Sequence, residues 1–413
     1  SGLVSVAADS TIRNLNTGGM TIQGQLTGEN EASTLINDGV LYLRPFAVAT
    51  EMMPIGTLDV VSNPTNWVIF GSGDKNQLLP GNVYQNLGIE NNDKLMGGGD
   101  IEVKGDLLVA ARVKPVDGTL DVFRFLLTGE ADQTIIGSGL GSIENLEIAK
   151  ASGKVVLGSD VEVSKLLVMS AGIIETGDYT LSLGTGGQLE ESRNSYISGR
   201  VVTRRSVSAG STRQFGGLGL KIRASGENAL GETLVTRTTG SAYEPGMIER
   251  YFDIQPSNNA NLGASVEFTY DERDLTGADE YDLYLEHLVS QDFFVTLDAS
   301  KIDTATNVLS QDDIDAFGIL TAKPTSIAVN AYPSPLRDDE DLNIEYVLQQ
   351  NGIVHLVVFD RVGRAIYRDR FSGESGKQLF VMKELNLAPG VYYVRIKAGR
   401  QKGYKSFLKL PAN

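Results

Sequence analysis

The chain has 413 residues, of which 41% are apolar, so it is long enough to bury cores in more than one domain. It contains no cysteine, which excludes disulfides and thiolate catalysis. Its net charge of −16 argues against nucleic acid as a partner, because phosphates would be repelled. The 46 glycines, without a long helix-forming stretch, predict an all-β protein of short strands and tight turns. Because the sequence begins at Ser1 and shows no signal peptide, we expect a mature, processed chain.

The N-terminal part contains an internal repeat. Units at about 70–126 and 127–189 share an Asn-Leu pair, at Asn86 and again 59 residues later at Asn145, and a glutamine precedes each pair. Within the units, apolar residues alternate with polar ones between glycines, which is typical of strand-turn-strand structure. One such unit buries little apolar area by itself. We therefore predict a β-solenoid-like repeat stack over residues 1–191, joined by parallel backbone ladders.

The pattern changes after residue 191. Between residues 192 and 323, short alternating runs recur at roughly ten-residue spacing with Gly, Pro, Asn and Asp between them, which predicts an antiparallel β-sandwich. Residues 324–330 are expected to form a linker. From residue 324 onward the chain carries 13 Lys and Arg against 9 Asp and Glu, a net charge of +4, so the body before it carries −20.

The remaining block, 331–413, is predicted to be a compact Ig-like β-sandwich. Its strands are expected at 342–348, 353–359, 364–371, 378–382, 391–398 and 403–410. Turns are expected at Gly352, Gly363 and Gly390, because glycine adopts backbone conformations that other residues avoid.

Three ordered motifs lie in this C-terminal block. It opens with Tyr-Pro-Ser-Pro, continues with an aromatic-Asp-x-x-Gly turn, and closes with a Leu-x-x-Gly-x-Tyr-x-Val strand and a Lys-containing strand. The motif positions are Tyr332, Pro333, Pro335, Asp360, Gly363, Gly390, Tyr392, Val394 and Lys405. In this order they resemble the type A sorting domain of proteins that the type IX secretion system of Bacteroidota exports. Ser334 stands where that family more commonly has Asn.

The resemblance implies a secreted protein of the cell surface, at the exterior of the outer membrane. The partners it implies are the type IX secretion translocon and outer-membrane shuttle proteins, and also surface lipopolysaccharide where the domain is cleaved. The repeats at about 70–190 are similar to glycine-rich β repeats in large surface proteins of the same bacteria. Segment 193–323 resembles the sandwich module that follows such repeats.

We expect no enzyme, because no catalytic or metal-binding constellation stands out. The two histidines, His287 and His355, each lie inside a strand pattern and have no partner at metal-ligand spacing. The acidic pairs that a lyase would use are Asp100 with Glu102, Asp160 with Glu162, and Glu190 with Glu191. Recurrence of the first two pairs in the repeat favours surface patterning. For the acidic run 338–341, a Ca²⁺ site and a solvated loop both remain open; no other cofactor is expected.

These observations predict a non-enzymatic, secreted cell-surface protein with a structural role, either adhesive or filament-forming. Self-association is expected because the terminal coils of a solenoid expose unpaired backbone donors and acceptors. Two alternatives remain open. The chain is a secretion substrate bound to its translocon with an incidental role of its own, or it is a polysaccharide-binding or lyase-type β-solenoid.

Overall fold

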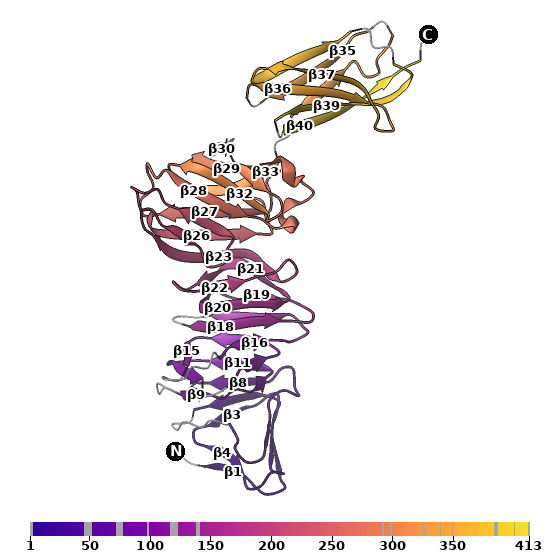
Figure 1. The fold of residues 1–413 in the computed structure, drawn as a ribbon. Helices are drawn as coiled ribbons and strands as arrows, with labels where there is room; N and C mark the ends of the chain where they lie inside the picture. The colour runs from indigo at the N-terminus through magenta and orange to yellow at the C-terminus, as the bar shows by residue number, and fades with distance from the viewer. Residues whose placement is uncertain are drawn as a thin grey trace.

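A computed structural model shows an elongated, all-β molecule with the N-terminus and the C-terminal strands at opposite ends (Figure 1). It describes residues 3–44, 52–71, 77–96, 99–115, 123–137, 141–290, 293–297, 300–324, 327–338, 340–348, 350–383, 387–399 and 401–411. Among these residues the only helical elements are the short 3₁₀ turns η1 (Glu272–Leu275) and η2 (Glu280–Asp282). No helix in this part of the chain has the length and apolar character needed to cross a membrane. The predicted fold class is confirmed.

Parallel strands form a solenoid of about eight turns in the part of the chain that the structure describes. The longest stack consists of β3 (Gly19–Ile22), β6 (Val40–Leu43), β8 (Trp67–Phe70), β11 (Asn86–Ile89), β14 (Leu107–Val109), β17 (Gln133–Gly137), β19 (Val155–Leu157), β21 (Ile173–Leu183) and β23 (Tyr196–Val207). A second stack consists of β9 (Gln77–Leu79), β12 (Lys94–Met96), β15 (Arg112–Pro115), β18 (Ser142–Ala149) and β20 (Val161–Ala171). A third stack includes β10 (Val83–Tyr84), β13 (Ile101–Val103), β16 (Phe125–Leu127) and β22 (Gln188–Glu190), with the later parts of β18 and β20. The first coils also contain β1 (Val4–Val6), β2 (Thr11–Asn14), β4 (Leu26–Gly28), β5 (Thr34–Asn37) and β7 (Thr57–Asp59).

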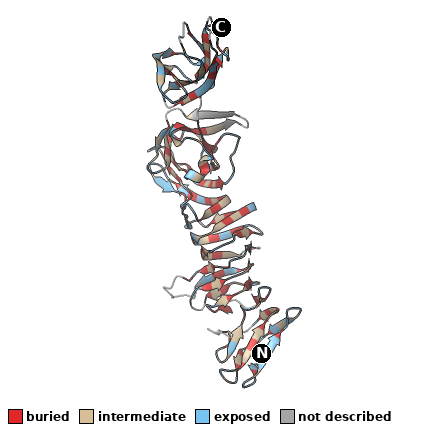
Figure 2. Cartoon of the chain, turned by 90° about the vertical axis from the view of Figure 1, so that its right-hand side faces the viewer, coloured by how far each residue is buried: buried red, intermediate tan, exposed pale blue. Residues whose placement is uncertain are grey.

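Apolar side chains lie directly above one another inside the solenoid. Leu41, Val68, Leu87, Leu107 and Ile135 are consecutive registered neighbours, and each is fully buried. A single coil would leave both sides of this apolar layer in water, and the next coil covers one of them. Buried and exposed positions consequently alternate along the strands, as Figure 2 shows. This stacking is the physical reason for the alternation in the sequence.

The glutamine that precedes each Asn-Leu pair is buried in both repeat units. Gln133 Nε2 donates to the carbonyls of Val103 (3.0 Å) and Gly105 (2.6 Å), and Gln77 Nε2 donates to the carbonyl of Leu43 (2.9 Å). Each glutamine thereby satisfies carbonyl groups of the preceding coil that would otherwise be buried without a donor. The shared glutamine therefore has a structural role in joining coils.

The 59-residue sequence repeat does not coincide with one coil. Leu87 and Leu107, which are registered neighbours in the longest stack, are only 20 residues apart. The counterpart of Leu87 in the second unit is Leu146, which pairs with Phe125 in the third stack. Corresponding residues of the two repeat units therefore lie on different faces of the solenoid. The same sequence pattern fits both faces, because every face needs the same alternation of buried and exposed residues.

The solenoid continues without a break into a central sandwich. β23 pairs in parallel with β21 on one side and antiparallel with β26 on the other. The sheet continues through β26 (Gly231–Thr239), β27 (Arg250–Pro256), β33 (Ile319–Pro324), β29 (Leu283–Ser290) and β30 (Phe293–Leu297). The second sheet consists of β24 (Thr212–Gln214), β25 (Leu220–Arg223), β28 (Ala264–Thr269), β32 (Val308–Ile314) and β31 (Lys301–Asp303). The rings of Phe252 and Phe268 meet edge to face between the two sheets, with centroids 5.1 Å apart.

The C-terminal module is a separate sandwich with its own core. One sheet consists of β34 (Val329–Tyr332), β35 (Leu342–Leu348) and β38 (Gly376–Met382). The other consists of β37 (Ala365–Gly373), β36 (Gly352–Phe359), β39 (Gly390–Ala398) and β40 (Gln401–Lys409). The strands predicted from alternation lie within two residues of the observed bounds. Of the expected linker 324–330, residues 325 and 326 lie outside the described residues.

Candidate functional site

The predicted Asp360 turn joins β36 to β37. Asp360 Oδ1 accepts hydrogen bonds from the backbone N–H groups of Val362 (3.1 Å) and Arg364 (2.9 Å), while Oδ2 accepts from Arg364 Nε (3.0 Å). Burial alone would raise the pKa of Asp360, but these donors hold it below its ordinary value. Gly363 has a φ of 80°, a left-handed conformation that glycine adopts without strain. The motif residues of this turn therefore fix its shape.

The Tyr-Pro-Ser-Pro segment follows β34 and lies along the last strand. β34 ends at Tyr332, which is 40% exposed, and Pro333 and Pro335 follow, both after cis peptide bonds. Because proline has no N–H, neither Pro333 nor Pro335 can donate to a strand ladder. The contact with the last strand is made by Ser334 between them, whose Oγ accepts from the N–H of Leu408 (3.1 Å) near the end of β40. The segment thereby closes against the C-terminal strand.

The third motif places its residues on β39. Tyr392 stacks on Phe407 with ring centroids 5.5 Å apart and donates its hydroxyl hydrogen to the carbonyl of Ala388 (2.7 Å). Val394 is fully buried in the core. Lys405, which pairs with Val394 in register, is exposed on the edge strand β40. This motif therefore combines core residues with one exposed cation.

Strand register brings the separate motifs to one end of the module. Gly390 pairs with Lys409, Leu336 bridges to Lys409, and Phe359, next to Asp360, pairs with Tyr393. The Tyr-Pro-Ser-Pro segment, the Asp360 turn and the start of β39 therefore meet at the end remote from the central sandwich. Figure 1 shows this end of the module, near the C-terminus, farthest from the rest of the chain.

Comparison with known proteins identifies this module. Residues 330–409 match the family model of the secretion system C-terminal sorting domain. The match supports a type IX secretion substrate, which is exported as a secreted or cell-surface protein and contacts the secretion machinery. No curated protein and no solved structure matches the chain.

A close approach of two strands makes one glycine of the sorting domain essential to its packing. A Cβ built on Gly403 would lie 1.9 Å from the carbonyl oxygen of Ile327 and 2.7 Å from Val329 Cγ2. The strands cannot separate freely, because Ile327 N–H donates to the carbonyl of Lys402 (3.1 Å). Gly403→Ala should therefore destabilise the sorting domain by about 2–3 kcal/mol, measured by thermal melting. Gly352→Ala, which meets nothing within 4 Å, is the matched control and should melt like the wild type.

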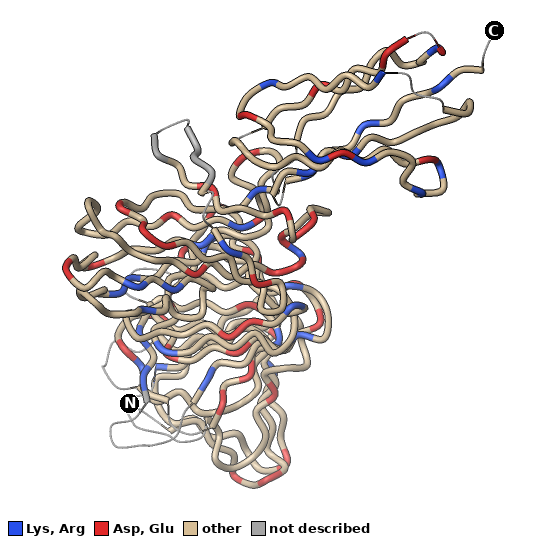
Figure 3. The backbone as a smooth tube through the Cα atoms, turned by 45° about the horizontal axis from the view of Figure 1, so that its top comes forward, with Lys and Arg blue, Asp and Glu red and all other residues tan. Residues whose placement is uncertain are grey.

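The outer face of the four-stranded sheet in the sorting domain is basic, which the sequence analysis missed. Cations occupy alternating positions on the outward side of three strands: Arg368, Arg370, Arg395, Lys397 and Lys402. A hollow of about 1040 Å³ opens on this face and extends to Gln401 at the end nearest the central sandwich. Figure 3 shows several Lys and Arg positions along the side of the sorting domain that faces the rest of the chain. Alternation of cations at 368 and 370, and at 395 and 397, was the available signal.

One cation of this face contacts the central sandwich. Lys402 Nζ lies 2.6 Å from Asp279 Oδ2 and 3.2 Å from Asp282 Oδ2, at the start and end of η2. The hydrogen bond with Asp279 raises the pKa of Lys402, and the same bond lowers the pKa of Asp279. The basic sorting domain therefore already binds carboxylates of the acidic body.

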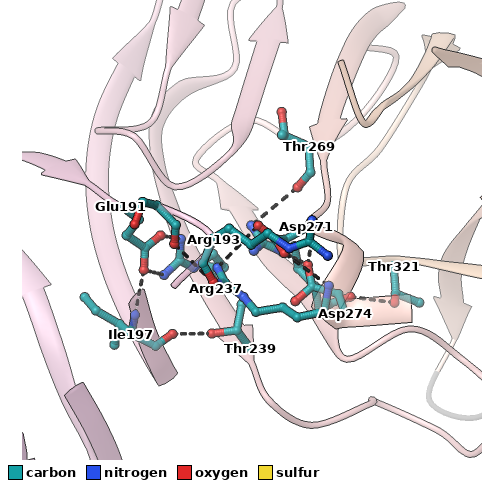
Figure 4. Close-up of polar contacts among 12 residues, drawn as sticks. Glu191, Arg193, Ile197, Arg237, Thr239, Thr269, Asp271, Asp274 and Thr321 are labelled. Atoms are coloured by element: carbon teal, nitrogen blue, oxygen red, sulfur yellow. Dashed lines mark hydrogen bonds and ion pairs between the residues drawn. The ribbon is translucent and has the colours of Figure 1, made fainter. Parts of the chain in front are cut away.

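A cluster of ion pairs lies where the solenoid meets the central sandwich (Figure 4). Glu191 follows β22 and binds Arg237 of β26 through two hydrogen bonds (2.5 and 2.9 Å), and also accepts from the N–H of Ile197 (2.7 Å). Arg250 Nε of β27 donates to Asp274 Oδ2 of η1 (2.6 Å). Glu191, predicted as a candidate acid, is thus held in a buried pair with Arg237, whose side chain is 1% exposed.

Three of the other candidate acids, Asp100, Glu102 and Asp160, bind neighbouring coils. Asp100 accepts from the backbone N–H (3.2 Å) and from Nε (3.0 Å) of Arg124, and Asp160 accepts from the N–H of Thr180 (2.8 Å). In both cases the donor lies on the following coil. Glu102 accepts from the hydroxyl of Thr128 (2.6 Å), also one coil further along. These contacts favour a role in joining coils.

The two histidines lie in different modules. His287 is on β29 of the central sandwich, where burial lowers its pKa, and His355 is on the exposed face of β36. Within the described ranges, no group of three or more His, Asp or Glu side chains is arranged to hold a metal ion. Asp339, in the acidic run 338–341, lies outside the described residues, so the Ca²⁺ hypothesis for that run remains a prediction.

Proposed function

We propose that this chain is a non-enzymatic structural or adhesive protein of the bacterial cell surface that assembles into filaments. The observation that supports this most directly is the unbroken backbone pairing from the solenoid to the central sandwich. Each coil bonds to the next through parallel ladders, and β23 belongs to both parts. Backbone pairing without an intervening linker makes a stiff rod, which is the form a surface scaffold needs.

The sorting domain supports a route of export for this rod. We propose that the source is a member of the Bacteroidota and that the partners are the type IX translocon and outer-membrane shuttle proteins. Attachment of the body to surface lipopolysaccharide would follow where the domain is cleaved. The motif residues that gather at the far end of the sorting domain offer an accessible recognition surface. Tyr332 is exposed at this end, and Lys405 is exposed on the adjoining edge strand β40.

Two other functions compete with this proposal. A substrate with an incidental role would purify together with translocon proteins. A polysaccharide lyase would lose activity on acidic glycans when Asp100 or Asp160 is changed. Because both carboxylates accept hydrogen bonds from the following coil, we expect their substitution to affect stability only.

Negative-stain imaging and sizing of the purified protein test the filament proposal. We expect single rods at low concentration and larger assemblies as the concentration rises, because β1, β2 and β3 of the first coil are paired on one side only among the described residues. The other end of the solenoid is covered by β26. A monodisperse monomer at every concentration would contradict filament formation. Imaging would still report whether the monomer is a rod.

A further inference from the structure

The outer face of the four-stranded sheet in the sorting domain carries a row of basic side chains on directly paired strands. His355 pairs in register with Arg370 on one side and with Lys397 on the other, and Lys397 pairs with Lys402. We call Arg370, His355, Lys397 and Lys402 the basic row. Neighbouring strands lie about 4.8 Å apart, so the row presents its positions at that interval.

A second pair of cations lies beside the basic row. Arg368 and Arg395 flank Val357 in register. Lys397 and Lys402 are directly opposed like charges, which destabilise a sheet, whereas Arg368 and Arg395 are separated by the strand that carries Val357. An anion over this face would lie close to cations of three strands at once.

Most of these cations have no carboxylate partner. Among the residues that the structure describes, no ion pair reaches Arg368, Arg370, Arg395 or Lys397, whereas Lys402 has Asp279 and Asp282. Arg395 Nε is also buried without a hydrogen-bond partner. Elsewhere in the same domain, Lys377 pairs with Glu345 (2.9 Å), whereas no ion pair among the described residues reaches Arg361, Lys383 or Lys405. What distinguishes this face is that four cations without an ion pair lie together on neighbouring strands.

The face is also hollow. The hollow of about 1040 Å³ is lined by His355, Arg368, Arg370, Arg395 and Lys397, together with the apolar side chains of Ile353 and Val357 and with small or polar residues. One carboxylate, Asp369, lies in the described lining, and it already accepts from the hydroxyl of Tyr367 (3.3 Å) and the N–H of Arg370 (2.7 Å). The hollow therefore suits an extended anionic ligand.

Aromatic rings adjoin the cations on the same face. Arg395 lies over the ring of Phe359, 5.0 Å from its centroid, and pairs in register with Tyr404, which is 56% exposed. Tyr393 pairs with Phe359 and is 44% exposed. Exposed aromatic faces next to cations offer a flat apolar surface beside the charges, and a sugar ring that carries an acidic group can use both.

We propose that this hollow binds an acidic polysaccharide. Its anionic groups would lie on the four cations without an ion pair, Arg368, Arg370, Arg395 and Lys397, and its sugar rings against the exposed ring of Tyr404, which pairs in register with Arg395 beside the hollow. Double-stranded nucleic acid is the less favoured polyanion, because its charge of one per about 1.7 Å of helix axis is repelled more strongly by the body of −20 than a single polymer with one charge per sugar. The proposal deepens the adhesive part of the proposed function, and binding by purified protein tests it separately from export and from rod formation.

Fluorescence anisotropy of labelled polygalacturonate oligomers, titrated with the full-length chain at low ionic strength, tests the proposal. We expect saturable binding that weakens as salt rises, because the contacts are between exposed charges. R368E/R370E should weaken binding by at least about tenfold, whereas K377E/K383E should change it by less than about twofold. Both double variants change the net charge equally and replace exposed side chains, and thermal melting confirms that each is folded.

Several results would overturn the proposal. One is equal weakening in the two double variants, which would mean attraction to net charge without a site. Another is no binding by the wild type. A third is tighter binding of single-stranded oligo-dT than of polygalacturonate, which would identify a nucleic-acid surface. A fourth is self-association that R368E/R370E abolishes in a protein that does not bind glycan, which would make a second copy the ligand.

Discussion

Removal of residues 327–413 should abolish export of the chain and leave a folded body inside the cell. The matched family model covers residues 330–409, so this truncation removes all of the sorting domain. The body should remain folded, because its buried core is separate from that of the sorting domain. Immunoblotting of surface, periplasmic and culture fractions measures the outcome. We expect the exported fraction to fall to the level of a strain that lacks the type IX system.

Two controls make this result specific. The full-length chain with Gly352→Ala retains the sorting domain and should be exported normally, since its new Cβ meets nothing within 4 Å. Limited proteolysis of the truncated chain should give the same stable body as the full-length protein. Export of the truncated chain at the full-length level would contradict the sorting role.

Arg237→Met should destabilise the body by about 3–5 kcal/mol, because it leaves the buried carboxylate of Glu191 without its charged partner. The double variant with Glu191→Gln should recover most of this loss, since no buried charge is then uncompensated. Urea unfolding of the four proteins in this cycle measures the coupling. The matched control is Lys221→Met, which breaks an exposed pair with Glu267 and should cost less than about 1 kcal/mol.

The same variant should weaken the loss of stability in acid that Glu191 causes in the wild type. Burial alone would raise the pKa of Glu191, but Arg237 lowers it below the ordinary value of 4.5. In the wild type the unfolded chain therefore takes up the proton first, and this contribution to stability is lost as pH falls below about 4.5. In Arg237→Met, only the N–H of Ile197 and the charge of Arg250 still oppose burial, so the pKa of Glu191 rises and less stability is lost as the pH falls. If the free energy of unfolding changed with pH in the same way in the two proteins, Glu191 and Arg237 would not be coupled.

The strands of the C-terminal module could be predicted well because local alternation and turn glycines define them. The strand predicted at 342–348 matches β35 (Leu342–Leu348), and Gly363 lies in the turn after Asp360 as expected. The solenoid was predictable from the same alternation. It was not predictable which face of the solenoid each strand belongs to, because Leu87 and Leu146 have the same local sequence pattern but lie in different strand stacks.

The basic face and the buried ion pairs could not be predicted from local pattern, because both depend on which strands become neighbours. Glu191 and Arg237 are 46 residues apart, and nothing near either residue distinguishes the buried pair from surface charges. In the same way, Arg370 and Lys397 lie on either side of His355 only after β36 takes its place between β37 and β39. The motif residues of the sorting domain were found because each motif is continuous in sequence.

Transfer of residues 327–413 to a reporter protein that normally stays in the periplasm tests most directly whether the sorting domain carries the information for export. The fusion is produced in a strain with a type IX secretion system and in the same strain without it, and the reporter outside the cell is measured in each. We predict that the reporter leaves the cell only where the system is present. A reporter that stays in the periplasm of both strains, or leaves both equally, would contradict the account.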